Sequence, residues 1–343
     1  MTSIADLAVI GSGSLARAVC CSLAVAAPFP LRVNVCARDA RKAAEVVYLA
    51  GARARLSGTP ARFEARPLGA EDADLILVCA SEQSPWERET APSAWTRLIA
   101  EAGFGITLPL QASVALSVAS ARRGATIVNA CYPDAVNPLL DACGAPVFCG
   151  IGNVAIITAS LAAALDVAPE RLKVLAHHAH LHPPSDPDSE ARAWLDGQPV
   201  SGVTEALAAQ RSTTRSQVNA VTGHSAALLL LGMLSGEALS NSLPGPLGLS
   251  GGYPVRLLGF KKIELDLPSG LDEAEAVGFN HRCAESEGVV VSASAVSFGE
   301  KARRALEPHV PELAAGFAPR DLPEVMEQFR ALRARLRQEG ARQ

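Results

Sequence analysis

The sequence has no block of basic residues and no excess of positive charge. Its 343 residues include 31 Lys and Arg and 35 Asp and Glu, which gives a formal net charge of -4 at pH 7. Proteins that bind nucleic acid concentrate Lys and Arg on one face, so we expect no nucleic-acid partner. The arginine-rich segments 53–55 and 330–337 are interpreted as solvated helix faces.

Paired cysteines, a secretion signal and a membrane-spanning run are also lacking. The eight cysteines form no Cys-x-x-Cys pair, and most stand in apolar runs, where a thiol behaves as a small hydrophobic group. This pattern favours a reducing compartment. The first residues lead directly into an apolar strand pattern rather than a signal peptide, and the longest apolar stretch, 226–234, is too short to cross a bilayer. We therefore expect a soluble cytoplasmic protein without membrane contact.

The composition is that of a globular protein, with 49% hydrophobic and 19% charged residues. Apolar runs alternate with helical patterns through the first half of the chain. This alternation predicts an α/β fold, a doubly wound parallel sheet covered by helices on both faces. The expected strands are residues 7–10, 31–37, 61–67, 74–80, 124–130 and 146–149, and the expected helices are 16–26, 40–50 and 114–121.

The second half follows a different pattern and predicts a mixed α+β domain. We expect a first domain over residues 1–150 and a second over 151–343. Helices are expected at 153–165, 216–238 and 322–338. The expected β-structure is a strand over 172–180 that runs into a histidine-rich turn, and a hairpin of 253–258 and 262–267 that follows a loop at 243–252.

The first predicted strand ends in Gly11-Ser12-Gly13-Ser14-Leu15-Ala16. A Gly-x-Gly-x-x-Ala segment between a strand and a helix is the dinucleotide-binding fingerprint. Gly11 permits the tight turn, and Gly13 lets the backbone approach a pyrophosphate at the helix N-terminus. The alternative is a glycine-rich turn in another kind of α/β domain. The expected cofactor contacts are Gly11, Ser12, Gly13, Ser14 and Leu15, with Cys79, Ala80 and Ser81 at the end of the fourth predicted strand.

The end of the second predicted strand bears on the choice of dinucleotide. An acidic residue there would hold the ribose hydroxyls of NAD, but the sequence reads Ala37-Arg38-Asp39. Arg38 suits a 2′-phosphate because a guanidinium forms bidentate bonds with phosphate oxygens. We therefore expect NADP(H) in preference to NAD(H). The alternative is that Arg38 is a solvated residue at a helix start and that Asp39 serves NAD.

Later motifs extend the pattern beyond a generic dinucleotide fold. Thr96-Arg97-Leu98 follows the fourth predicted strand, Asn129-Ala130-Cys131-Tyr132-Pro133-Asp134 follows the fifth, and Leu175-Ala176-His177-His178-Ala179-His180 leads into the histidine-rich turn. With the glycine fingerprint, these segments resemble, distantly, the lactate/malate dehydrogenase superfamily. They are similar to its mobile-loop Thr/Ser-Arg-Leu, its Asn-Pro-Val-Asp segment and its Gly-Glu-His-Gly-Asp turn.

The resemblance implies a Rossmann domain followed by an α+β domain, and a role for several side chains. By position, His178 would exchange a proton with the substrate hydroxyl while hydride passes to or from nicotinamide, with His177 as the next candidate. Arg97 would match the loop arginine that polarises the substrate carbonyl. The residues expected at the substrate are Asn129, Tyr132, Arg97 and His224.

One departure from the superfamily bears on the substrate. The superfamily carries an Asp and an Arg three residues apart on the helix after the sixth strand, where the Asp orients the histidine and the Arg grips a carboxylate. The corresponding segment here, 153–161, contains neither an acid nor a base. Ile or Thr cannot replace a bidentate Arg–carboxylate pair. We therefore expect a substrate other than a simple 2-hydroxy acid.

The predicted function is that of an NAD(P)-dependent oxidoreductase acting on a carbonyl or alcohol, or on an imine. The alternative is a non-redox dinucleotide-binding regulator or scaffold that kept the fold. A metal-dependent glycosidase of the related hydrolase family ranks last, and the closely spaced histidines at 177, 178, 180 and 182 fit no closed zinc site, so no metal is expected. By resemblance, the chain forms a homodimer or homotetramer.

Overall fold

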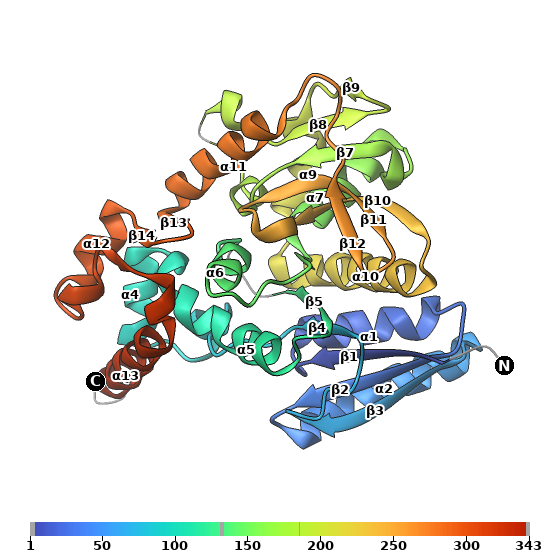
Figure 1. The fold of residues 1–343 in the computed structure, drawn as a ribbon, viewed down its shortest axis with the longest axis horizontal. Coiled ribbons are helices and arrows are strands. Elements are labelled where there is room, and N and C mark those ends of the chain that lie inside the picture. Colours follow the sequence, from blue (N-terminus) through green and yellow to red (C-terminus); the bar gives the residue numbers. More distant parts are fainter. Residues whose placement is uncertain (1–3, 131–133, 185, 341–343) are drawn as a thin grey trace.

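A computed structural model describes residues 4–130, 134–184 and 186–340. Its first half contains a six-stranded parallel sheet with the strand order β3-β2-β1-β4-β5-β6 (Figure 1). This is the Rossmann order, in which the chain reverses direction across the sheet between β1 and β4 and leaves a crevice at the carboxyl ends of the strands. The predicted fold class is confirmed. The strands are β1 (Ala5–Ile10), β2 (Leu31–Ala37), β3 (Ala61–Pro67), β4 (Leu75–Val78), β5 (Thr126–Asn129) and β6 (Cys149–Gly150).

Both faces of the sheet are buried, as its apolar strands require. In β1, Leu7 and Val9 belong to one core cluster and Ala8 and Ile10 to another, because successive side chains of a strand point to opposite faces. The first face packs against α1 (Ser14–Ala26) and α2 (Ala40–Ser57). The helices α4 (Ala94–Ala102), α5 (Leu108–Ala121) and α6 (Val136–Ala142) contribute to the cluster on the second face, and the one-turn α3 (Glu87–Thr90) precedes α4.

Residues 151–287 contain two small antiparallel sheets and a long helix that lies on the first half. Helix α10 packs closely on α1, since a Cβ built on Gly223 would lie 2.5 Å from the Cβ of Ala18 (Figure 1). The sheets have the orders β7-β8-β9 and β10-β11-β12. The elements are α7 (Asn153–Leu165), β7 (Leu172–Leu175), β8 (Arg192–Leu195), β9 (Gln198–Pro199), α8 (Val203–Ala206), α9 (Ala208–Ser212), α10 (Arg215–Ser235), β10 (Ala238–Pro244), β11 (Gly252–Leu258), β12 (Lys262–Leu265) and α11 (Glu273–Glu287).

Residues 289–340 return to the first half. Figure 1 shows α13 beside α4 and α5, away from α7 and α10. Phe329 and Leu336 of α13 share a core cluster with Trp95 of α4. The division into 1–150 and 151–343 stays a prediction. The C-terminal segment packs on α4 and α5, two of the helices on the second face of the Rossmann sheet. Its elements are β13 (Val289–Val291), β14 (Val296–Phe298), α12 (Glu300–Leu306), β15 (Gly316–Phe317) and α13 (Leu322–Gly340).

Three local predictions in the second half need correction. The helix predicted to reach residue 238 ends at Ser235, because Gly236 adopts a left-handed conformation (φ +77°) that closes it. The predicted loop over 243–252 is shorter at both ends, because Leu243 and Pro244 belong to β10 and Gly252 begins β11. The predicted strand over 172–180 stops at Leu175, and residues 178–181 form a short 3₁₀ helix instead.

Two apolar helical stretches, 104–121 and 217–235, are long enough by length and composition to cross a membrane, and 61% and 50% of them are buried. The core helices of soluble proteins share this character. Both stretches are longer than 226–234, the longest apolar run in the sequence, because they include a few polar residues. They are weak evidence for a membrane span.

Candidate functional site

The glycine turn after β1 has the shape that a pyrophosphate site needs. Gly11 has φ +120°, and a Cβ there would lie 2.9 Å from the carbonyl oxygen of Cys79, so no other residue fits. Gly13 caps the N-terminus of α1, and no described heavy atom lies within 4 Å of a Cβ built on it. The turn therefore has one glycine that the fold requires and one that leaves the backbone open towards a cavity.

A cavity of about 560 Å³ runs along the carboxyl edge of the parallel sheet. Its walls come from the ends of β1, β4, β5 and β6 and, on the other side, from α9 and α10. This is the crevice in which α/β sheets bind ligands. The predicted cofactor contacts all lie in its described lining: Gly11, Ser12, Gly13, Ser14, Leu15, Arg38, Cys79, Ala80 and Ser81.

Arg38 and Asp39, the two alternative candidates for contact with the adenosine ribose of a dinucleotide, have different positions in the structure. Arg38 lines the cavity together with Lys42. Asp39 caps α2, where its Oδ1 accepts a bond from the backbone N–H of Lys42 at 3.1 Å. This bond holds the pKa of the Asp39 carboxyl below its usual value. The described wall beside β2 thus carries two cations, and the neighbouring acid is engaged in a helix cap.

Asn129 ends β5 and lines the cavity with only 2% of its surface exposed. Its Nδ2 donates to Oδ1 of Asn137 at 2.7 Å, and Nδ2 of Asn137 donates to the carbonyl of Gly245 at 3.3 Å. These bonds join the end of the parallel sheet to the loop after β10. The second predicted substrate residue of this segment, Tyr132, lies outside the described residues.

Asp134 is a site residue that the sequence reasoning did not single out. It lines the cavity, is 8% exposed, and accepts one hydrogen bond on each carboxylate oxygen. Asn153 donates to Oδ1 through its Nδ2, and His178 donates to Oδ2 through its backbone N–H, both at 2.8 Å. Its position four residues after the end of the fifth predicted strand was the available signal.

His178 is buried behind this carboxylate. Its Nδ1 lies 3.0 and 3.1 Å from the two carboxylate oxygens of Glu287, at the end of α11. The Nδ1 of His177 is 3.8 Å from the same carboxylate. Neither histidine is in the described cavity lining, and each is 3% exposed. The acid that the sequence lacks after the sixth strand is therefore supplied to His178 from a different helix.

No protein-family model matches this chain, and no curated protein matches it in sequence. Solved structures match it in fold. The malate dehydrogenase from Plasmodium falciparum gives a TM-score of 0.57 at 15% sequence identity, over 83% of this chain and 97% of that one. The malate dehydrogenase from Picrophilus torridus gives 0.56 at 16% identity, over 83% and 96%. The lactate dehydrogenase from Eimeria maxima, solved with NADH and oxamate, gives 0.51 at 14% identity, over 84% and 95%.

The chain has the fold of malate and lactate dehydrogenases. The predicted distant resemblance is confirmed at the level of the fold. Within this dehydrogenase fold, α7 carries no charged side chain. Its Thr158 and Ser160 hydroxyls donate to the backbone carbonyls one turn earlier, at 2.9 and 2.8 Å. The helix expected from the sequence is thus formed, and it lacks the Asp and Arg that the superfamily carries there.

Two predicted substrate residues are not brought to the cavity. Arg97 is exposed on α4, and His224 is exposed on α10, and neither is in the described lining. On α10 the lining comes from Val218, Asn219 and Thr222. Each helix residue advances the direction of the side chain by about 100°, so the side chains of His224 and Thr222 lie about 160° apart around the helix axis, on nearly opposite sides. The family-like position of each residue along the chain did not fix the face on which it lies.

The two remaining histidines of the turn differ in their positions: His180 is buried and hydrogen-bonded, and His182 lies at the cavity. The His180 ring accepts the His177 backbone N–H at 2.7 Å, lies 2.8 Å from the Ser189 carbonyl through Nε2, and stacks on Phe279. Burial lowers the pKa of His180, which favours its neutral form. His182 is exposed and lines the cavity. Within the described ranges, no three His, Cys, Asp or Glu residues are grouped as metal ligands.

One wall of the cavity is formed by the wall segment, residues 81–87, which follows β4. Ser81, Gln83, Ser84 and Trp86 of this segment line the cavity. The fully buried Gln83 accepts from Trp95 Nε1 at 2.9 Å. Its backbone carbonyl accepts a bond from the Gln111 side chain, which also lines the cavity, at 2.8 Å. These bonds hold the middle of the segment.

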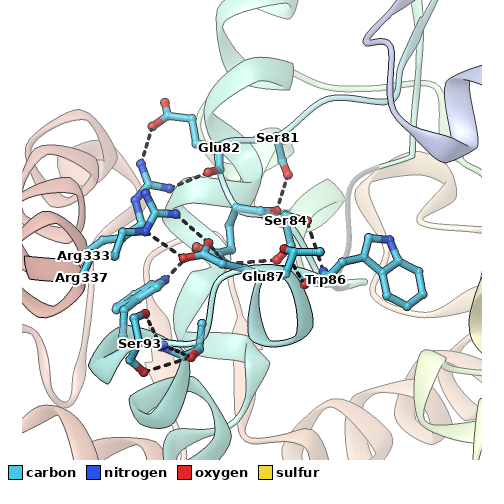
Figure 2. A network of polar contacts seen from close by, with 12 residues as sticks. Ser81, Glu82, Ser84, Trp86, Glu87, Ser93, Arg333 and Arg337 are labelled. Carbon is cyan, nitrogen blue, oxygen red and sulfur yellow. Dashed lines mark hydrogen bonds and ion pairs between the residues drawn. The ribbon is translucent and has the colours of Figure 1, made fainter. Parts of the chain in front are cut away.

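The C-terminal helix α13 holds both ends of the wall segment (Figure 2). Arg330 donates to the Glu82 carboxylate, with one bond of 2.9 Å, and Arg333 donates to the Glu82 carbonyl. Arg337 donates to both oxygens of Glu87, at 2.8 and 2.6 Å. The bond from Arg330 lowers the pKa of Glu82. Figure 2 shows the indole of Trp86 pointing away from this network.

Proposed function

We propose that the protein is a nicotinamide dinucleotide-dependent oxidoreductase that acts on a carbonyl or alcohol, or on an imine or amine. The supporting observation is the single cavity that joins the glycine turn to Asn129 and Asp134 at the end of β5. The open backbone of Gly13 and the N-terminus of α1 suit a pyrophosphate. When bound, the nicotinamide ring supplies or accepts hydride.

The preferred cofactor in this proposal is NADP(H). Arg38 and Lys42 stand together in the described wall beside β2, and Asp39 is used as a helix cap. A phosphate oxygen accepts bonds from a guanidinium and an ammonium. The same arrangement places no described carboxylate in this part of the wall for the ribose hydroxyls of NAD.

In this proposal, His178 carries the substrate proton and Glu287 keeps the ring oriented. An imidazole titrates near neutrality and suits this task. A carboxylate 3.0 Å from Nδ1 orients the ring, and in this proposal Nε2 is the atom that exchanges a proton. The absence of an arginine on α7 supports a substrate other than a simple 2-hydroxy acid.

A second candidate function is a non-redox dinucleotide-binding regulator or scaffold. It is favoured by the position of His178, which is 3% exposed and outside the described cavity lining. A regulator needs the glycine turn but no side chain that exchanges a proton. The two candidates therefore agree on dinucleotide binding and differ on turnover.

Titration of the full chain with NADPH and NADH, followed by nicotinamide fluorescence, tests the shared part. We expect NADPH to bind more tightly, and Arg38→Asp to shift the preference towards NADH. Arg41→Asp is the matched control, because Arg41 is exposed, pairs with Glu45 and is outside the described lining. No binding of either dinucleotide at near-millimolar concentration would refute both candidates.

A screen of carbonyls and imines with NADPH then separates them. For any substrate found, we expect His178→Asn to abolish turnover and to spare NADPH binding, while His224→Asn leaves both unchanged. Binding without oxidation of NADPH by any compound would favour the regulator.

We also propose a soluble, cytoplasmic homodimer or homotetramer. Exposed apolar side chains on α10, Val221 and Leu228 among them, support association. A monomer by sedimentation equilibrium would refute this part of the proposal.

A further inference from the structure

Charge is unevenly distributed along the described cavity wall. Arg38 and Lys42 stand past the end of β2. Asp134 follows β5, on the other side of β1 and β4 in the sheet, and it is the only acidic residue among the described lining residues. The two ends of the cavity therefore present opposite charges.

Arg211 lines the wall as well, but its charge is already balanced. Its guanidinium donates to both carboxylate oxygens of Glu190, at 2.9 and 2.8 Å, and the side chains are 6% and 10% exposed. Its remaining bonds go to the carbonyl of His180. Arg211 thus fastens the histidine turn to α9. Among the described Lys and Arg of the wall, none at the Asp134 end keeps an unbalanced charge for an anionic ligand.

The same end offers hydrogen-bond acceptors. A carboxylate has about four acceptor sites, and the described bonds to Asp134 use one on each oxygen. The side-chain oxygen of Gln210, also in the lining, is buried and has no partner among the described atoms. A buried carboxylate attracts a cation more strongly than an exposed one because the surrounding dielectric constant is lower. These features suit a ligand that carries N–H donors and positive charge.

We infer that this end of the cavity binds a substrate with a positively charged nitrogen, an ammonium or an iminium group, through the carboxylate of Asp134. This rests on the proposed function in assigning the Asp134 end to the substrate. The ligand class is an organic amine or the imine related to it. Trp86 lines the same cavity, and an aromatic face attracts such a cation.

Three probes of the same shape and different charge test this assignment: protonated benzylamine, benzoate and benzyl alcohol. Each is titrated by calorimetry into the full chain, with and without saturating NADP⁺. We expect benzylammonium to bind about 10- to 100-fold more tightly than benzoate, the range expected for a hydrogen bond to a charged group. Benzoate binding as tightly as benzylammonium, or no binding of benzylammonium in either condition, would overturn the inference.

Asp134→Asn should lower the affinity for benzylammonium by about tenfold or more and leave benzyl alcohol unchanged. An unchanged affinity for benzylammonium in the folded variant would overturn the inference. Since Asp134 also holds His178 and Asn153, a second variant is needed in case this one fails to fold. Ile156→Arg places a cation in the wall from α7, and we expect it to reverse the selectivity towards benzoate, while Ile156→Met keeps it. An unreversed selectivity in Ile156→Arg would count against the assignment.

Titration with NADP⁺ alone separates this inference from the proposed function. If NADP⁺ fails to bind but benzylammonium binds in an Asp134-dependent manner, the cofactor assignment is refuted and the cation site stands. If NADP⁺ binds and the probes show no charge preference, the cation site is refuted and the cofactor assignment stands.

Discussion

Replacing Arg337 by Met should loosen the wall segment without touching the cavity directly. Arg337 donates at 2.8 and 2.6 Å to Glu87, whose side chain is 7% exposed, while that of Arg337 is 44% exposed. The substitution leaves a buried carboxylate with the bond from Gln83 Nε2 at 2.9 Å. A hydrogen bond to a charged group contributes about 1.5–3 kcal/mol, and the exposure of Arg337 reduces the effect through solvent screening. We expect a loss of about 2 kcal/mol.

Hydrogen exchange measured by mass spectrometry over residues 81–90 is the appropriate assay. A loss of about 2 kcal/mol in local stability corresponds to roughly 30-fold faster exchange of these amides. Arg335→Met is the matched control, because Arg335 is exposed on the same helix, and its replacement should change stability by less than about 0.5 kcal/mol.

A double-mutant cycle completes the experiment. Glu87→Gln removes the buried charge, so Arg337→Met should cost less in that background than in the natural chain. Equal exchange rates in Arg337→Met and Arg335→Met, or strictly additive effects in the cycle, would show that α13 does not hold the wall segment.

Other predictions concern pH and packing. Because the bond from Arg330 lowers the pKa of Glu82, the pair should stabilise the protein above the unfolded value of about 4.5 and lose its effect as pH falls through the folded pKa. The free energy of unfolding, measured with urea at several acidic pH values, should therefore depend less on pH in Arg330→Met than in the natural chain. An unchanged pH dependence would contradict this. Burial lowers the pKa of His180, so its contribution should be present above the unfolded value of about 6.5 and lost as pH falls through the folded value; His180→Asn should remove that slope, which denaturation at several pH values measures. Gly223→Ala should destabilise the protein by about 1–3 kcal/mol, because its Cβ has no room against α1. Gly51→Ala, in the open middle of α2, should stabilise the protein by about 0.5–1 kcal/mol. Thermal unfolding measures both variants, and a change of stability in the same direction for both would contradict the packing described.

The elements that the sequence predicted well are those with strong local signals. The bounds of β2, β3 and α7 agree with the predicted residues, because β2 and α7 are largely apolar segments and β3 alternates apolar and charged residues up to Pro67. Helix α11 was not predicted, although Ala276, Phe279 and Cys283 recur at helical spacing between an Asp cap and a closing Gly. The many polar residues of α11 made this apolar spacing hard to recognise in the sequence.

The site was predictable only where backbone geometry defines it. The glycine turn and Arg38 follow from the order of strand, turn and helix. The His178–Glu287 contact spans 109 positions and the Arg337–Glu87 pair spans 250, and no local pattern links such partners. The family motifs singled out Arg97 and His224 by their place along the chain, but the helix face on which a residue lies depends on packing between elements. Tertiary contacts, rather than propensity, decide these positions.

The dependence of residues 81–87 on residues 330–337 has a consequence for biosynthesis. Domains tend to fold from the N-terminus while the ribosome is still adding residues, and the Rossmann sheet has all its strands by residue 150. The arginines that fix one side of the crevice, however, lie after residue 329 and are translated later than all of these strands. A product that ended before residue 330 would carry the glycine turn of the crevice beside a wall segment without its arginine contacts.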